Sequence, residues 1–129
     1  MNIPKDLKYS SDHEWVRVEG NVAFIGITDF AQSQLGDIVF ADLPAEGRVI
    51  KANEVFSVVE SVKAVSDIIT PVSGKIVQVN PALDGAPELI NQDPYGEGWI
   101  VAVELADKSE LDGLMDDAAY AKVAAEGGH

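Results

Sequence analysis

A repeated turn-and-strand unit constrains the fold of this chain more than any other feature of its sequence. Pro44-Ala45-Glu46-Gly47-Arg48-Val49-Ile50 is echoed by Pro71-Val72-Ser73-Gly74-Lys75-Ile76-Val77. An offset of 27 residues separates the two copies, and the same offset separates Asn53 from Asn80. Proline and glycine at these positions predict turns, and the β-branched residues that follow predict strands. The repeat therefore predicts a two-fold-repeated β-unit.

One basic residue lies alone between the two copies. Lys63 is the only lysine or arginine between Lys51 and Lys75, and its neighbours are mostly valine, isoleucine, serine and alanine. A lone lysine is ordinarily a solvated surface charge. Because the flanking units are symmetric, we instead expect Lys63 at the tip of a hairpin whose turn lies near residues 61–64.

The segment around Lys63 fits two kinds of secondary structure. Its apolar residues recur at helical spacing, which is typical of an amphipathic helix. Its density of β-branched residues and the turn-plus-strand units on either side favour a hairpin instead. No glycine marks the turn, although a type I turn needs none. The hairpin is our interpretation, and on the residues alone the helix stays open.

Other strands follow from runs of apolar and β-branched residues. These segments are 7–10, 13–18, 22–27, 38–41 and 99–105, and the repeat adds 48–50 and 75–79. Thr28 is a suitable N-cap for a short helix from Asp29 to Leu35, which Gly36 would end.

The last third of the chain mixes loop and helix signals. Residues 80–94 are interpreted as a loop because prolines and a glycine interrupt them. Ser109 could cap a helix that begins at Glu110, and Asp116 or Asp117 could cap another through residues 118–125. Residues 127–129 are expected to be a frayed end.

The composition limits the chemistry that the chain can support. With 129 residues it is long enough for one domain with its own core, and without cysteine it can form neither a disulfide nor a cysteine-ligated metal site. His13 and His129 are far apart and make a poor metal site. The formal net charge of -13 disfavours nucleic acid and anionic membranes as partners. No signal peptide or membrane-spanning run is visible, so we expect a bacterial cytoplasmic protein.

No pattern indicates a self-sufficient active site. The serines lack a glycine-flanked elbow and a nearby histidine, which disfavours a hydrolase triad. Gly96-Glu97-Gly98 is too short for a phosphate-binding loop and is interpreted as a tight turn. Among 22 acidic residues, no pair stands out as general acid and base. These negative results favour a carrier or binding module, and a lysine on a hairpin tip would suit covalent modification.

Four groups of residues are spaced along nearly the whole chain. They are Tyr9-Ser10-Ser11-Asp12-His13-Glu14-Trp15; Gly26-Ile27-Thr28-Asp29-Phe30-Ala31-Gln32 through Leu35-Gly36-Asp37-Ile38-Val39; Glu60-Ser61-Val62-Lys63-Ala64 with Pro71-Val72-Ser73-Gly74; and Asn91-Gln92-Asp93-Pro94-Tyr95-Gly96-Glu97-Gly98-Trp99. In this order they resemble the H proteins of the glycine cleavage system. The resemblance implies a mainly β, lipoyl-domain-like barrel-sandwich hybrid with two-fold repeated sheets and short helices. It would form a single domain of residues 1–129, with C-terminal helices at about 109–126.

The resemblance also implies a carrier function without catalytic residues. By its place in the motif, Lys63 would carry lipoate in amide linkage. The lipoyl group would take the aminomethyl fragment from a pyridoxal-phosphate glycine decarboxylase to a tetrahydrofolate-dependent aminomethyltransferase. A flavin-dependent dihydrolipoamide dehydrogenase would then reoxidise it, and a lipoylating enzyme would be a further partner. An additional role as lipoyl donor to other proteins stays open.

Four further residues receive roles from the resemblance. Glu60 and Gly74 lie in the region that a lipoylating enzyme reads, although Glu60 could be a solvated charge and Gly74 a glycine needed for a positive-φ turn. Glu14 is the first candidate, and Asp67 the second, to hold the ammonium of the loaded arm in a surface cleft. Alternatively, both are solvated carboxylates.

Three other classes of protein compete with this interpretation. A biotin carrier shares the fold, but its lysine usually lies between two methionines, whereas Lys63 lies between Val62 and Ala64. A lipoyl domain of a 2-oxoacid dehydrogenase would usually show an aspartate before the lysine and a flexible linker after the domain. An unmodified acidic adaptor would use Lys63 only as a turn residue.

Overall fold

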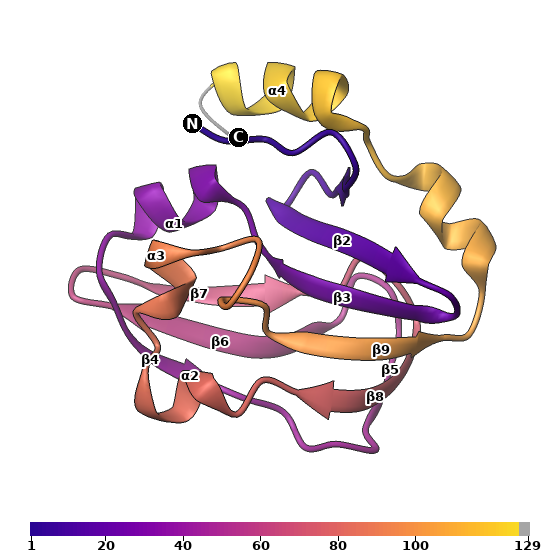
Figure 1. Ribbon diagram of the computed structural model, residues 1–129, viewed down its shortest axis with the longest axis horizontal. Helices are drawn as coiled ribbons and strands as arrows, with labels where there is room; N and C mark the ends of the chain where they lie inside the picture. Colours follow the sequence, from indigo (N-terminus) through magenta and orange to yellow (C-terminus); the bar gives the residue numbers. More distant parts are fainter. Residues whose placement is uncertain (127–129) are drawn as a thin grey trace.

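The computed structural model describes residues 1–126, which form two antiparallel β-sheets with short helices around them (Figure 1). The larger sheet contains, in spatial order, β1 (Lys8–Tyr9), β2 (Glu14–Glu19), β3 (Val22–Ile27), β9 (Val101–Leu105), β8 (Gly74–Val79) and β5 (Val49–Ile50). The smaller sheet contains β4 (Ile38–Asp42), β6 (Val55–Ser61) and β7 (Val65–Ile69). This mainly β, two-sheet arrangement confirms the predicted fold class, and the sheets do not close into one barrel.

Strand alternation assembles the main core from both sheets. The burial alternates on part of the sheet, as at the start of β8, whereas β9 buries three consecutive residues, Val101 to Val103. Ile25, Val59, Ile76 and Val103, from four different strands, have no exposed surface. Burying an aliphatic side chain of this size stabilises the fold by about 1.5–3 kcal/mol. The core thus holds the smaller sheet, and with it the β6–β7 hairpin, against the larger one.

The hairpin prediction is confirmed, and the alternative helix is wrong. Val59 pairs with Ser66 and Glu60 with Val65, which places the turn at residues 61–64. β-branched side chains fit the pleated strand surface better than the helix, so they outweigh the helical spacing of the apolar residues.

Two helices begin where their caps predict. α1 (Asp29–Leu35) follows Thr28, whose Oγ1 accepts a hydrogen bond from the Ala31 amide at 3.2 Å, and it ends at Gly36 with φ +80°. α4 (Asp117–Ala125) follows Asp116, whose carboxylate accepts one from the Ala119 amide at 2.8 Å.

The two copies of the repeat lie side by side in the larger sheet. β5 and β8 pair antiparallel, with Val49 opposite Lys75 and Ile50 opposite Gly74. The two glycines nevertheless serve different purposes. Gly47 has φ +93°, whereas Gly74 is not among the positive-φ residues of the described chain. The expected positive-φ turn at Gly74 is therefore wrong.

The region predicted as a loop contains two short helices. They are α2 (Ala82–Gly85) and α3 (Leu89–Gln92). Leu83 and Ile90 are buried in the main core. Tertiary packing therefore stabilises short helices in a segment that its prolines had indicated to be a loop. The Asn80 side chain accepts a hydrogen bond from the Ala82 amide at 3.2 Å, which helps to start α2.

The C-terminal prediction is wrong in one detail. Residues Lys108–Gly113 form a 3-10 helix, η1, and its cap is Asp107 rather than Ser109. The Asp107 carboxylate accepts hydrogen bonds from the Ser109 amide at 2.9 Å and hydroxyl at 2.6 Å. The predicted frayed end at residues 127–129, which includes His129, lies outside the described residues. Among residues 1–126, no helix is both long enough and apolar enough to cross a membrane.

Candidate functional site: a hairpin tip beside a pocket

The turn between β6 and β7 is held by one serine. The Ser61 amide donates to the Ala64 carbonyl at 2.8 Å, and the Ser61 hydroxyl accepts from the Ala64 amide at 3.0 Å and the Lys63 amide at 3.3 Å. Hydrogen bonds from a serine side chain to the next backbone amides are a common means of closing a turn without glycine. The turn is therefore tight and locally determined.

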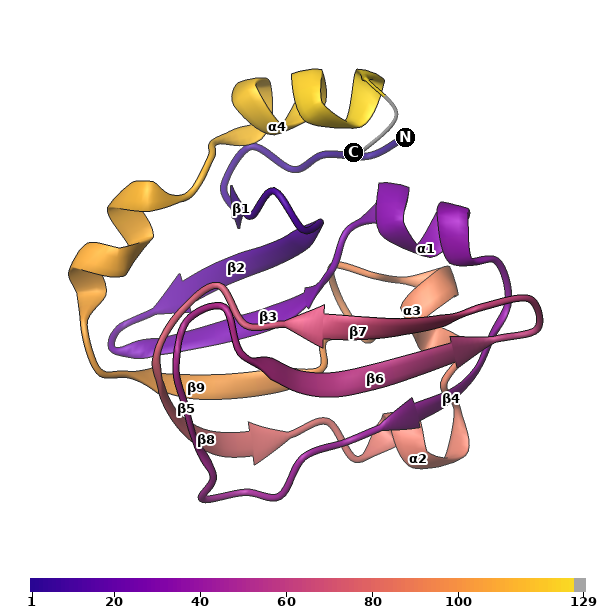
Figure 2. The same ribbon diagram turned by 180° about the vertical axis from the view of Figure 1, so that it is seen from behind.

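Lys63 is exposed at this tip, which projects beside α1 in both ribbon views (Figure 2). The neighbouring Val62 is 69% exposed and donates its amide to the Asp37 carbonyl at 3.0 Å, which ties the tip to the segment after α1. In residues 1–126 the salt bridges are Arg17–Glu19 and Arg48–Glu54, so none of them engages the Lys63 amine.

The Lys63 side chain passes close to the end of α1. A Cβ added to Gly36 would lie 3.2 Å from Lys63 Cε and 3.8 Å from Nζ. Leu35, the residue before Gly36, lines a pocket of about 260 Å³ between α1, the start of β2, and β7. The aliphatic chain of Lys63 thus lies against Gly36, next in sequence to a residue of this pocket, which we call the arm pocket.

Glu14 forms a buried acidic part of the arm-pocket wall. It is the first residue of β2 and only 2% exposed, and its carboxyl accepts a hydrogen bond from the Ser10 hydroxyl at 2.6 Å. Burial raises the pKa of Glu14 to about 8, although the hydrogen bonds from Ser10 and from the Ile69 backbone oppose the shift. Glu14 is therefore not a solvated carboxylate, and at neutral pH its neutral form predominates.

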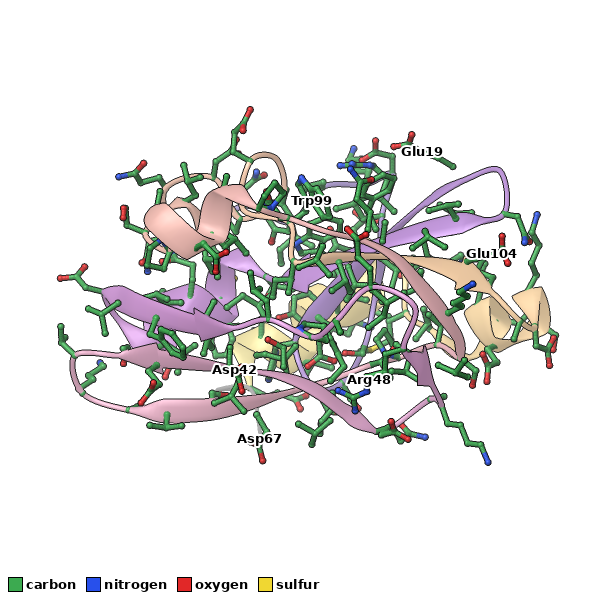
Figure 3. The ribbon with its side chains drawn as sticks, turned by 90° about the horizontal axis from the view of Figure 1, so that it is seen from below. Glu19, Asp42, Arg48, Asp67, Trp99 and Glu104 are labelled. Carbon is green, nitrogen blue, oxygen red and sulfur yellow. The ribbon has the colours of Figure 1, made fainter. Side chains whose placement is uncertain are left out.

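Asp67 lines the same pocket in a different environment. It is exposed on β7, whereas Ile68 beside it, which also lines the pocket, is buried. In Figure 3 the labelled Asp67 side chain points away from the ribbon. The structure thus brings both predicted arm-cleft residues, Glu14 and Asp67, to one pocket, but only Glu14 is buried there.

Comparison with known proteins supplies the family. The family model described as Glycine cleavage H-protein matches residues 7–127.

The chain belongs to the glycine cleavage H-protein family.

It is 62% identical over 126 residues to the glycine cleavage system H protein of Symbiobacterium thermophilum, which covers 98% of each chain. The relative from Bacteroides fragilis is 53% identical over 123 residues, or 95% of this chain and 98% of the relative. The crystal structure of the glycine cleavage system H protein from Mycobacterium marinum superposes with a TM-score of 0.86 at 39% identity, covering 95% of this chain and 99% of that one. H proteins are the lipoyl-carrier subunits of the glycine cleavage system.

Within this H-protein fold, Glu60 and Gly74 belong to different sheets. Glu60 is half-buried on β6, opposite Phe40 and Val65 and next to the turn. Gly74 lies on β8, paired with Ile50 and Leu105. A Cβ there would lie 2.1 Å from the Glu104 carbonyl oxygen, so the close approach of β9 by itself requires glycine.

The sequence predicted no role at the arm pocket for two residues, His13 and Tyr120. His13 lines the pocket, and its Nδ1 lies 2.7 Å from the Tyr120 hydroxyl, 107 residues further along the chain. Tyr120 is the one aromatic residue of the predicted alanine-rich C-terminal helix. Such a residue predicts a packing contact but not the partner that it packs against.

Proposed function

We propose that this H-protein chain is the lipoylated, non-catalytic carrier that moves the aminomethyl group between the enzymes of the glycine cleavage system, with lipoate attached to Lys63. The observation that supports this assignment is the exposed Lys63 on a rigid, tight turn, outside the salt bridges of the described chain. Such a lysine is open to a modifying enzyme, and an arm on its amine can reach partners in solution.

The residues at the tip fit a lipoyl group. Lys63 supplies the amine for the amide bond, and the small Ala64 and the exposed Val62 leave the approach to it open. When bound, lipoate would supply a disulfide that accepts the aminomethyl group and a dithiol that is later reoxidised. Once modified, Lys63 acts as a tether.

The partners proposed for this carrier are four. They are a pyridoxal-phosphate glycine decarboxylase, a tetrahydrofolate-dependent aminomethyltransferase, a flavin-dependent dihydrolipoamide dehydrogenase and a lipoylating enzyme. Because its relatives are bacterial, we place the chain in a bacterial cytoplasm. Of the two residues predicted for recognition, Glu60 lies beside the turn and is the one that the lipoylating enzyme would contact more directly. Gly74 lies in the other sheet, so a contact with it would have to involve that sheet.

The arm pocket is proposed to shelter the loaded arm from water. Its wall combines the apolar Phe30 and Leu35 with the Glu14 carboxyl, a composition that suits an apolar chain ending in an ammonium. A cation beside Glu14 favours the ionised carboxylate, so at neutral pH Glu14 would release its proton as it takes up the hydrogen bond. Asp67 contributes negative charge from the exposed side.

Intact-mass measurement of the protein from a lipoate-competent host tests the modification. A lipoyl mass increment that peptide mapping assigns to Lys63 is expected. A biotinyl increment would show a biotin carrier, and no increment an unmodified adaptor. A lipoyl group found on Lys51 or Lys75 would overturn the assignment of Lys63.

A further inference from the structure

One side chain of the C-terminal helix contacts a residue that lines the arm pocket. Tyr120 of α4 is fully buried and stacks on Tyr9, with ring centroids 4.8 Å apart and an interplanar angle of 11°. Its hydroxyl lies 2.7 Å from Nδ1 of His13 and 2.7 Å from Oγ1 of Thr28. One phenol therefore joins three segments that are far apart in sequence: the residue before β2, the residue before α1, and α4 itself.

One hydrogen-bond partner of Tyr120 lines the pocket, and the other caps a helix that forms part of its wall. His13 lines the pocket directly and immediately precedes Glu14. Thr28 caps α1, which supplies the lining residues Phe30 and Ala31, and the Thr28 amide donates to the His13 carbonyl at 3.0 Å. Because Thr28 fixes the first turn of α1, displacement of Thr28 would move that wall relative to Glu14.

Two further observations show how closely this network is coupled to the pocket. His13 has φ +71°, an uncommon backbone conformation for a residue other than glycine, and its ring also packs against Phe30 with centroids 5.0 Å apart. Burial raises the pKa of Tyr120, the hydrogen bond with Thr28 lowers it, and the nearby Glu14 carboxyl raises it. The hydroxyl is therefore within electrostatic reach of Glu14.

We propose that Tyr120 is a positioning residue for the arm pocket, whose hydroxyl fixes His13 in the wall and Thr28 at the cap of α1 so that the pocket retains a loaded arm. The inference depends on the pocket assignment made under Proposed function. Tyr120 contributes no atom to the pocket lining and acts through these two residues. The hairpin tip takes no part in the network, because its turn is closed by Ser61 and tied to Asp37. The C-terminal helix thus serves retention of the loaded arm and leaves lipoylation unaffected.

Tyr120→Phe in the full chain tests this role, because it removes the hydroxyl and keeps the ring that stacks on Tyr9. Reciprocal backbone hydrogen bonds between Tyr9 and Met115, each 2.8 Å, continue to hold the segment that leads into α4. Tyr9→Phe is the matched control, because it keeps the other ring of the stacked pair and removes only a hydroxyl that donates to the Pro4 carbonyl at 2.5 Å. Neither Tyr9 nor Pro4 lines the arm pocket.

Two measurements report on the pocket. The first is the half-life of the aminomethyl-loaded protein, measured at fixed pH and salt without partner enzymes. We expect this half-life to fall by about three- to tenfold in Tyr120→Phe, which corresponds to the loss of one or two hydrogen bonds. The second is the titration of the Glu14 carboxyl carbon by NMR in the unmodified protein. Its midpoint should move from about 8 toward the ordinary value of a glutamate, because a looser pocket admits water. Tyr9→Phe should change neither value, and all three proteins should be lipoylated at the same rate.

Each outcome decides between the hypotheses. A half-life and a Glu14 titration in Tyr120→Phe equal to those of wild type would overturn the positioning role. An equal effect of Tyr9→Phe would also overturn it, because the cause would then be general loosening. Glu14→Gln separates this failure from failure of the pocket assignment. If Glu14→Gln shortens the half-life and Tyr120→Phe does not, the pocket stands and Tyr120 has no role in it.

Discussion

The hairpin tip around Lys63 and the arm pocket around Glu14 are neighbours that are built in opposite ways. The tip is closed by hydrogen bonds within the four residues from Ser61 to Ala64, and its side chains are mostly exposed. The pocket is assembled from three segments far apart in sequence, and its central carboxyl is buried. A residue at the tip can therefore change without disturbing the fold, whereas a residue of the pocket affects both the fold and the chemistry.

The largest expected effect tests the independence of the tip. Lys63→Arg keeps the charge but removes the amine that can form the amide, because a guanidinium is a weak nucleophile. Lipoylation should be abolished, while the free energy of unfolding should change by less than about 0.5 kcal/mol, as for an exposed residue. Intact mass and urea denaturation measure the two quantities, with Lys75→Arg as the exposed control. Residual lipoylation of Lys63→Arg at another lysine would contradict the prediction.

The next prediction tests the coupling of the pocket to the fold. Glu14 has a pKa of about 8 in the folded protein, raised by burial from its ordinary value of 4.5. Between these two values the unfolded chain loses the proton that the folded chain keeps, so stability falls as pH rises from about 5 to about 8. Glu14→Gln removes this dependence, and the difference should be on the order of 3 kcal/mol across that range. Urea denaturation at several pH values would contradict the idea if the wild-type and Gln curves ran parallel.

The same variant tests the chemistry of the pocket. Glutamine keeps the shape of Glu14 but cannot become negative, so loaded Glu14→Gln should lose its aminomethyl group faster than wild type. Asp67→Asn should have a smaller effect, because Asp67 is exposed and its charge is screened by solvent. Unchanged half-lives in both variants would remove these residues from the site.

The next prediction tests whether Gly74 is needed for recognition by the lipoylating enzyme or for packing of the core. An added Cβ would lie 2.1 Å from the Glu104 carbonyl oxygen and 2.6 Å from Val103, in backbone and core that cannot easily move. Gly74→Ala should therefore lower the free energy of unfolding by about 2 kcal/mol, as for overpacking. Gly85→Ala, whose Cβ would have nothing within 4 Å, is the control. A stable Gly74→Ala that is lipoylated slowly would instead show recognition.

The features that the sequence predicted depend on local contacts, and the features that were missed depend on distant ones. The Thr28 cap, the Gly36 end of α1 and the β6–β7 turn depend on residues within a few positions, so the sequence predicted them correctly. The family motifs also pointed to Glu14 and Asp67, which one pocket brings together.

The features that were missed depend on partners far along the chain. Tyr120 contacts His13 across 107 residues, and Gly74 is required by Glu104 on another strand. Neither partner can be identified from spacing in a single sequence. The two helices in residues 80–94 were missed for a related reason, because burial of Leu83 and Ile90 outweighs the prolines nearby.

The smallest expected effect concerns Glu60, which lies next to the tip and outside the pocket. Its side chain shares the outer face of the smaller sheet with its pairing partners Phe40 and Val65, both more than half exposed. This face is open to a lipoylating enzyme, so Glu60→Ala should slow lipoylation and leave the half-life of the loaded arm unchanged. The free energy of unfolding should change by less than about 0.5 kcal/mol, because Glu60 makes no salt bridge among the described residues.

Glu54→Ala is the control for lost negative charge, because Glu54 lies just before β6 and forms an exposed salt bridge with Arg48. If Glu60→Ala and Glu54→Ala are lipoylated at the same rate as wild type, Glu60 is an ordinary surface charge, and recognition depends on Lys63 and the shape of its turn.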